Sequence, residues 1–148
     1  MLTNKKIGIT VLFILILISS LFFIRKFIVM KQINFIIEDC INLIENSEQQ
    51  KIIKYISPEY SDAYGNTFET LNNDAGKLKF IDSAKIRIVK KKFSALNNSE
   101  AQLSLSVLIN FKIKELGKLD AFEEFTLYFH KYKDNWSVRK LEKNEKRN

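Results

Sequence analysis

The feature that most constrains this chain is an uncharged apolar stretch near its N-terminus. Residues 7–24 read IGITVLFILILISSLFFI and contain no Asp, Glu, Lys or Arg. A helix needs about 20 such residues to cross the roughly 30 Å hydrocarbon core of a bilayer. A cleaved signal peptide would have a shorter apolar region and a small-residue cleavage site, whereas Ser19-Ser20 is followed by Leu21, Phe22 and Phe23. We therefore predict an uncleaved membrane anchor over residues 7–30, after a short tail at 1–6.

The formal charge of +7 is unevenly distributed along the chain. Residues 1–30 contain Lys5, Lys6, Arg25 and Lys26 but no acid, so +4 flanks the apolar stretch and +3 belongs to residues 31–148. Cations beside an apolar span meet lipid headgroups, which makes the bilayer the first expected partner. The remaining chain has no basic stripe interleaved with aromatic residues, so we expect no nucleic-acid partner.

Residues 31–78 predict helices. Apolar residues recur there at the spacing of one helical face, and no Pro or Gly separates them from the anchor: Ile33, Ile36, Ile37, Cys40, Ile41 and Ile44. Ser47 and Gln50 resemble a capping box that begins a second, short helix, which ends before Pro58. A third helix is predicted after Asn66 or Thr67, through Phe68, Leu71 and Leu78.

Strands follow the helices. Every odd position from Ala101 to Ile113 is apolar, and Leu108 is the exception among the even positions. This period of two predicts a long strand with one face in the core. Further strands are expected over residues 85–93, around Phe122 to Phe129, and from Trp136 to Leu141, with turns at 97–99, at Gly117 and at Asp134-Asn135. A phase slip at Glu123-Glu124 predicts a β-bulge.

Few residues are suited to catalysis or metal binding. One Cys, one His and four Gly leave little for a metal centre, a nucleophile–base pair or a phosphate loop, so we expect no cofactor. Cys40 lies on an apolar helix face, which indicates a packing thiol. His130 is out of phase with the neighbouring apolar strand residues, which indicates an exposed histidine rather than a general base.

Two short motifs resemble bacterial proteins of the nuclear transport factor 2-like (NTF2-like) superfamily. The run ISPEYSDAYG at 56–65 is similar to the loop after the second helix, and KDNWSV at 133–138 is similar to the last hairpin. The resemblance covers about residues 31–141 and implies an α+β fold, in which a strongly curved sheet wraps around helices to form a cone. We therefore expect a transmembrane helix, two or three helices packed on a curved antiparallel four-stranded sheet, and a polar tail at 142–148.

Three groups of residues are candidates for function. Polar residues of the loop, which could close the turn or face a ligand, are Tyr60, Asp62 and Tyr64. Apolar residues expected to line the cone are Leu105, Ile109 and Phe111. A basic run that could be a solvated face or could contact the membrane or a partner is Lys90, Lys91 and Lys92.

These features favour a membrane-anchored, non-catalytic interaction or assembly module of the cell envelope. Its partners would be other envelope proteins or a second copy. The alternative is a protein that binds a lipid or another hydrophobic small molecule in the cone. An enzyme is the third hypothesis, because enzymes of the superfamily place Asp, His, Tyr or Arg inside the cone, whereas the predicted inward faces here are apolar. The resemblance and the anchor together indicate the bacterial inner membrane, with the domain outside the cytoplasm, since short N-terminal tails usually stay inside.

Overall fold

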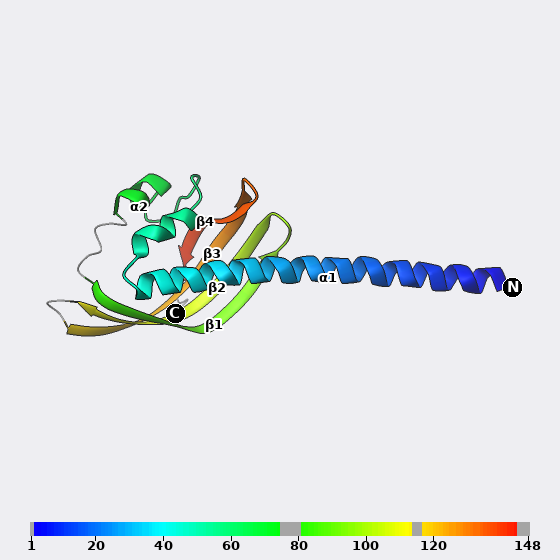
Figure 1. Ribbon diagram of the computed structural model, residues 1–148, viewed down its shortest axis with the longest axis horizontal. Coiled ribbons are helices and arrows are strands. Elements are labelled where there is room, and N and C mark those ends of the chain that lie inside the picture. The colour runs from blue at the N-terminus through cyan, green and yellow to red at the C-terminus, as the bar shows by residue number, and fades with distance from the viewer. Residues whose placement is uncertain (1, 75–80, 114–116, 145–148) are drawn as a thin grey trace.

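The computed structural model describes residues 2–74, 81–113 and 117–144. A long N-terminal helix is followed by two short helices and then by four strands (Figure 1). The elements are α1 (Leu2–Glu45), the 3₁₀ helix η1 (Gln49–Tyr55), α2 (Phe68–Asp74), β1 (Ile81–Leu96), β2 (Glu100–Ile113), β3 (Gly117–Tyr132) and β4 (Asn135–Lys143).

Helix α1 is continuous from the apolar stretch into the folded domain, as the sequence indicates. Its 44 residues extend about 66 Å at 1.5 Å per residue. The side chains from residue 9 to residue 28 are exposed, apart from the half-buried Lys26, whereas Val29, Ile33, Ile36 and Ile37 are buried. The N-terminal half of α1 therefore extends away from the domain, and the C-terminal half belongs to its core (Figure 1).

The end of α1 differs from the expectation for Ser47. Ser47 has a φ of 60°, and the N–H of Glu48 donates to the carbonyl of Leu43 at 2.7 Å. These features form a Schellman motif, in which a left-handed residue satisfies the last helical carbonyls. The prediction that Ser47 caps the second helix is wrong, because Ser47 ends α1 and η1 begins after Glu48 without a side-chain capping bond.

The short helices follow the predicted order. Thr67 caps α2, since the Thr67 N–H donates to Thr70 Oγ1 at 2.7 Å and the Thr70 N–H donates to Thr67 Oγ1 at 3.3 Å. Phe68 and Leu71 lie in this helix and pack on the core. Leu78, the third predicted apolar position, lies outside the described residues.

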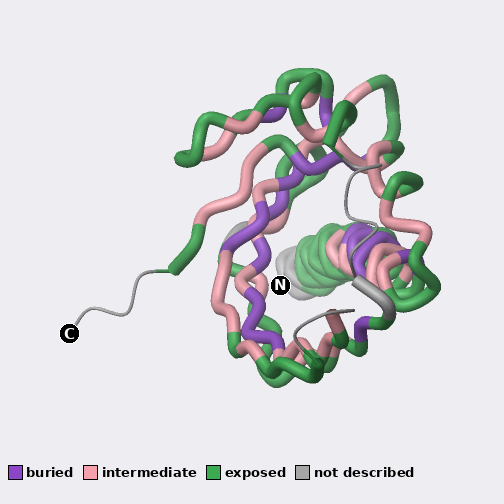
Figure 2. Tube along the Cα trace, turned by 90° about the vertical axis from the view of Figure 1, so that its left-hand side faces the viewer, coloured by how far each residue is buried: buried purple, intermediate pink, exposed green. Residues whose placement is uncertain are grey.

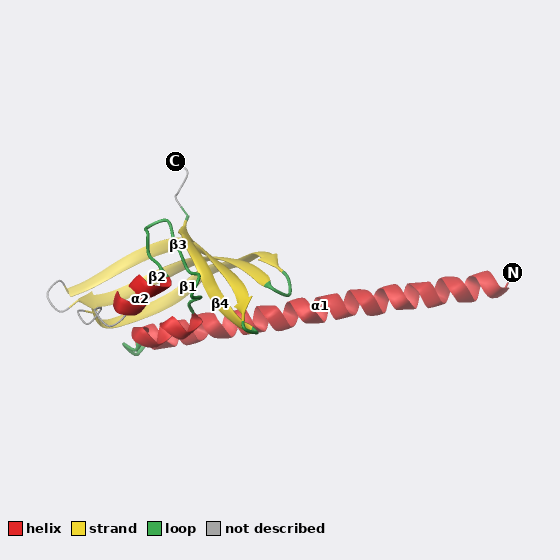
Figure 3. Ribbon diagram, turned by 90° about the horizontal axis from the view of Figure 1, so that it is seen from above, coloured by secondary structure: helices red, strands yellow, loops and turns green. Residues whose placement is uncertain are grey.

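The four strands form one antiparallel sheet in the order β1-β2-β3-β4. The predicted alternation of β2 is confirmed in its N-terminal half, where Ala101, Leu103, Leu105 and Val107 are buried. The sheet curves around α1, and Figures 2 and 3 show the helix lying along its concave side. The core is the contact between this face of the sheet and the C-terminal half of α1.

The β-bulge predicted at Glu123-Glu124 is wrong. The β2–β3 register is unbroken there, since Val107 pairs with Glu123 and Ser106 pairs with Glu124. The phase slip arises because Phe122 faces the outer side of the sheet, opposite Leu108 on β2. Leu108 and Phe122, which both break the alternation of their strands, therefore form a single cross-strand apolar pair. The irregularities lie instead within the β1–β2 pairing and between Tyr128 and Phe129 in the β3–β4 pairing.

The last hairpin turns one residue earlier than predicted. Its two turn residues are Lys133 and Asp134, with φ of 47° and 66°, and Tyr132 pairs with Asn135 on either side. Two successive positive φ values define the type I′ turn, whose twist matches that of the flanking strands. Gly117 is the first residue of β3 and has a φ of 79°. β4 continues to Lys143, so part of the predicted polar tail is strand, and residues 145–148 lie outside the described residues.

Candidate functional site

The loop after η1 brings Tyr60 and Asp62 together. The Asp62 carboxylate accepts hydrogen bonds from the Tyr60 hydroxyl at 3.1 Å, the Tyr64 N–H at 2.9 Å, the Asn66 N–H at 3.0 Å and the Asn66 side-chain amide at 2.9 Å. Burial raises the pKa of Asp62, but the donors from Asn66, Tyr64 and Tyr60 outweigh it and leave the pKa below its ordinary value. Four donors on one ionised carboxylate hold the loop closed.

The two tyrosines of the loop have opposite surroundings. Tyr60 is buried in the core cluster, and burial, with the adjacent Asp62 charge, raises the pKa of its phenol. Tyr64 is 63% exposed and contributes its backbone N–H, not its ring, to Asp62. The loop-closing interpretation of Tyr60 and Asp62 is the one that this geometry favours, because their polar atoms contact each other and the loop backbone.

The same segment is also pinned to the edge of the sheet. Ile56 forms a parallel bridge with Val138, the Ser57 N–H donates to the Val138 carbonyl at 2.9 Å, and the Ser61 N–H donates to the Arg139 carbonyl at 3.2 Å. These bonds cover part of the β4 edge, which would otherwise present unpaired backbone groups.

The predicted cone-lining residues become less buried along β2. Leu105 is buried and belongs to the core cluster, Ile109 is partly buried against that cluster, and Phe111 is partly buried farther along β2. Phe111 and Leu119 form a cross-strand pair at the end of the sheet remote from the apolar half of α1. A cleft of about 600 Å³ opens there, lined also by Glu45, Ala84 and Asp120.

The predicted lysine run is divided between the two faces of β1. Lys91 pairs with Leu105 on the concave side, and its Nζ donates to Asn34 Oδ1 of α1 at 2.9 Å. Lys90 and Lys92 are exposed and pair with Ser106 and Ser104, whose side chains face the outer side. Lys91 thus contacts α1, and Lys90 and Lys92 remain candidates for contact with a partner.

His130 is half-buried rather than exposed. It lies on the face of β3 opposite Phe129, and its Nε2 is 2.8 Å from Ser57 Oγ, which also accepts the Glu59 N–H at 3.2 Å. A serine beside a histidine can act as a nucleophile–base pair, but the Ser57 side chain is 0% exposed and has no access for a substrate. The pair instead fixes the loop to the outer face of the sheet.

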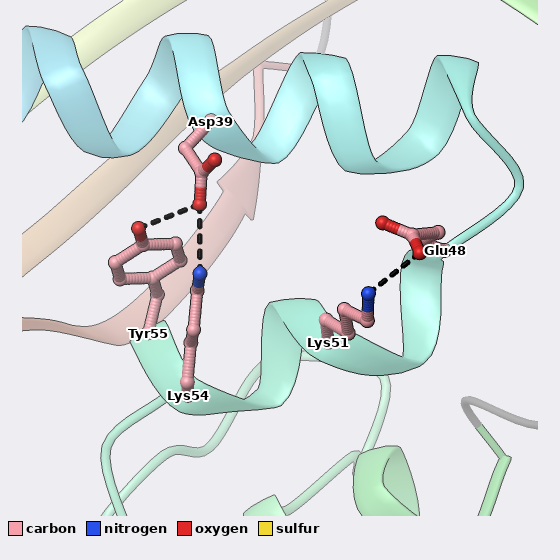
Figure 4. Close-up of polar contacts among 5 residues, drawn as sticks. All are labelled: Asp39, Glu48, Lys51, Lys54 and Tyr55. Atoms are coloured by element: carbon pink, nitrogen blue, oxygen red, sulfur yellow. Dashed lines mark hydrogen bonds and ion pairs between the residues drawn. The ribbon is translucent and has the colours of Figure 1, made fainter.

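A polar cluster between α1 and η1 was not apparent in the sequence. Asp39 Oδ2 accepts the Tyr55 hydroxyl at 2.7 Å and forms an ion pair with Lys54 Nζ at 2.9 Å (Figure 4). Bonds from Lys54 and Tyr55 lower the pKa of Asp39. The second pair in this view, Lys51 with Glu48 at 2.5 Å, lies within one helical turn. The Asp39 cluster joins two helices, so its role is to orient η1 on α1.

Neither a reactive thiol nor a metal cluster is found in residues 2–74, 81–113 and 117–144. Burial, reinforced by the charge of Asp39, raises the pKa of the Cys40 thiol to about 12, so the thiol stays protonated as a packing group. No group of three or more His, Cys, Asp or Glu side chains in these ranges could hold a metal ion.

Comparison with known proteins gives a result at the level of structure alone. No protein-family model and no curated protein matches the sequence. A scytalone dehydratase-like protein of Novosphingobium aromaticivorans is 11% identical, with a TM-score of 0.67 over 82% of this chain and 87% of that one. A type 2 hexachlorocyclohexane dehydrochlorinase, LinA, is 10% identical, with a TM-score of 0.69 over 82% and 89%. An NTF2-like superfamily protein of Salmonella enterica is 12% identical, with a TM-score of 0.66 over 78% and 89%.

The chain has the NTF2-like fold. The expected curved four-stranded sheet packed on helices is therefore confirmed. The NTF2-like proteins that it resembles include enzymes and a protein named only for its superfamily, so the fold does not select an activity. Helix α1, over the range Ile9–Glu45, is long and apolar enough to cross a membrane.

Proposed function

We propose that this chain is a single-pass protein of the bacterial inner membrane whose NTF2-like domain is a non-catalytic interaction module of an envelope assembly. The observation that carries the proposal is the exposed apolar half of α1. Large side chains such as Leu12, Phe13 and Phe23 have no covering partner within the described chain. In water this surface would be unfavourable, whereas in a bilayer it is matched by lipid.

The charges around the span are compatible with a domain outside the cytoplasm. Lys5 and Lys6 precede the span, and Arg25 and Lys26 follow it, so the two flanks are nearly balanced. Long domains translocate largely regardless of charge, so balanced flanks do not prevent export of the folded domain. This arrangement supports the localisation that we propose.

The outer face of the sheet supports an interaction role. The helices pack on the concave side, and on the opposite side Leu108 pairs with Phe122, whose side chain is 44% exposed. Charged residues surround this apolar pair, among them Arg87 and Asp120 on the adjoining strands. An apolar centre with a polar rim is the usual composition of a protein interface.

Site-specific photo-crosslinking in living bacteria tests this role. A benzophenone amino acid replaces Phe122 in the full chain, and the matched control replaces Tyr64, an exposed aromatic residue in the loop between η1 and α2. We expect a discrete adduct, with an envelope protein or with a second copy, from position 122 and none from position 64. Absence of a discrete adduct at 122, or equal adducts at both positions, would contradict the interaction role.

A second candidate function is binding of a hydrophobic small molecule at the remote end of the cone. The observation that favours it is the cleft beside Phe111, where Leu119 is 40% exposed. Solvent extraction of the purified full chain followed by mass spectrometry would then yield one bound compound. The yield of that compound would fall in the Phe111→Ser variant. A chain that carries no compound in stoichiometric amount argues against this function.

A further inference from the structure

The end of the domain that faces the apolar half of α1 lies at the level where the span ends. Leu96, Asn97 and Asn98, at the tip of the β1–β2 hairpin, line one cleft together with α1 residues from Ile18 to Val29. The apolar stretch ends at Ile24, so the hairpin tip lies beside the last turns of the span. In Figure 1 the tips of the hairpins β1–β2 and β3–β4 both lie at the side of the domain from which the apolar half of α1 extends.

The β3–β4 hairpin lies slightly farther along the helix. Trp136 Nε1 donates to Gln32 Oε1 at 2.9 Å, and the Lys131 N–H donates to the Ser99 carbonyl at 2.9 Å, so the two hairpins are joined. Gln32 is eight residues beyond Ile24, or about 12 Å along the helix. Lys133 lies three residues from Trp136 toward the hairpin turn and therefore approaches the headgroup layer, which is roughly 5–8 Å thick on each side of the bilayer core.

Five cations gather at this end, which we call the basic collar. They come from α1 and from the β3–β4 hairpin: Arg25, Lys26, Lys31, Lys131 and Lys133. The described residues provide no ion-pair partner for any of them. Each of the four lysines lies over an aromatic ring, those of Phe22, Phe27, Trp136 and Tyr132. The acidic residues at this end are Glu100 and Asp134. The collar therefore has a net positive charge of about three and is rich in aromatic rings, a composition that suits a membrane–water interface.

We propose that the basic collar docks the domain directly on the bilayer that anchors it, by contact with anionic phospholipid headgroups. The inference rests on the proposed membrane anchoring and adds to it a fixed orientation. A docked collar would hold the sheet upright on the membrane, and the outer face with Phe122 would then face sideways, toward neighbours in the plane of the membrane. Charge complementarity identifies the occupant as an anionic lipid surface.

Depth-dependent quenching tests the docking. The full chain, with Cys40→Ala, carries a single labelled cysteine at Asn98→Cys and is placed in nanodiscs that contain a lipid-borne quencher. The matched probe is Asn110→Cys, an exposed asparagine of the same strand pair at the remote end of the sheet. We expect strong quenching at position 98 in nanodiscs with phosphatidylglycerol, weaker quenching in pure phosphatidylcholine, and little at position 110 in either.

Charge variants separate docking from simple proximity. In Lys31→Gln/Lys131→Gln/Lys133→Gln, the ratio of docked to undocked domain should fall about fivefold for each charge removed, and quenching at 98 should fall to its level in phosphatidylcholine. The control Lys112→Gln/Lys118→Gln removes two exposed lysines from the remote end and should leave quenching unchanged. Unchanged quenching in the collar variant, or equal quenching at 98 and 110, would overturn the docking.

A third probe distinguishes failure of docking from failure of the anchor. Leu15→Cys lies in the middle of the apolar stretch and should be quenched in every nanodisc that contains the quencher. Quenching at 15 without quenching at 98 would reject the docking and leave the anchor in place. Absence of quenching at 15 would reject the anchor, and the docking with it.

Discussion

Asp62 shows that a carboxylate in a loop can be committed entirely to the fold. The sequence left open whether it faces a ligand or closes the turn, and its four hydrogen bonds engage Tyr60, Tyr64 and Asn66. A carboxylate in such surroundings stays ionised at neutral pH, since the sum of these effects lowers its pKa. Asp62 is thereby suited to hold a loop and poorly suited to take up a proton.

The Asp39 cluster should make the stability of the domain depend on pH. The pKa of Asp39 is lowered in the folded state by Lys54 and Tyr55, so the stability that it contributes is present above the unfolded pKa of about 4 and is lost as the pH falls through the folded pKa. Asp39→Asn should therefore lower the Tm of the full chain in detergent at pH 7 and have a smaller effect below about pH 4. Fluorescence of Trp136, the single tryptophan, reports the unfolding.

The matched control for Asp39 is Glu48→Gln. Glu48 pairs with Lys51 within one turn on an exposed surface, where such pairs contribute little. We expect its Tm to equal that of the parent at both pH values. An Asp39→Asn effect that is independent of pH would show that the carboxylate charge is not the source of the stability.

Ser57 makes a second prediction at the scale of one residue. Ser57→Ala leaves the His130 Nε2 and the Glu59 N–H without their partner, at a cost of about 1–3 kcal/mol in the free energy of unfolding. The control is Ser61→Ala. It should leave the free energy of unfolding unchanged, because the Ser61 hydroxyl forms no hydrogen bond with the described residues. Chemical denaturation followed by Trp136 fluorescence measures both. Equal stability of the two variants would remove the structural role assigned to the Ser57–His130 pair.

At the scale of elements, periodicity in the sequence predicted where the strands lie better than it predicted which side chains face outward and where the turns fall. The alternation from Ala101 to Ile113 located β2 to within one residue. The β-bulge at Glu123-Glu124 was predicted wrongly because periodicity alone treats every apolar residue as inward, whereas Phe122 pairs with Leu108 on the outer face. The one-residue error at the Lys133-Asp134 turn arose because Asp-Asn resembles a turn dipeptide as closely as Lys-Asp does.

The candidate site could be predicted only in part, for a physical reason. Tyr60 and Asp62 are two residues apart, so local loop chemistry suggested their contact. Asp39 and Tyr55 are 16 residues apart on two helices, and Ser57 and His130 are 73 apart. Contacts of that kind depend on how α1, η1 and the sheet pack together, and no local spacing in the sequence encodes that packing.

Substitutions on the inward face of β2 test where the core lies. Leu103 is 0% exposed, so Leu103→Ala should lower the free energy of unfolding by about 2–5 kcal/mol, through lost burial and the cavity left behind. Leu119→Ala, at a strand position that is 40% exposed, should change it by less than about 0.5 kcal/mol. Denaturation of the full chain in detergent compares the two variants. Similar losses would mean that the core does not lie between β2 and α1.

At the scale of the whole molecule, one helix has two different environments. Residues such as Phe13 lie on the exposed half of α1, and residues such as Ile33 lie in the core of the domain. No Gly or Pro interrupts α1 between residues 9 and 45, so the two halves form one rigid rod. Insertion of the first half in a bilayer would therefore fix the position of the NTF2-like domain relative to the membrane surface.

Membrane integration and sidedness of the full chain are the measurement that tests the proposed function most directly. With a small tag at the N-terminus and expression in bacteria, anchoring predicts that the chain stays in the membrane fraction after alkaline carbonate extraction. Protease added to spheroplasts should then digest the domain and leave the N-terminal tag protected. Release of the chain by carbonate, or protection of the domain in intact spheroplasts, would contradict an anchored module outside the cytoplasm.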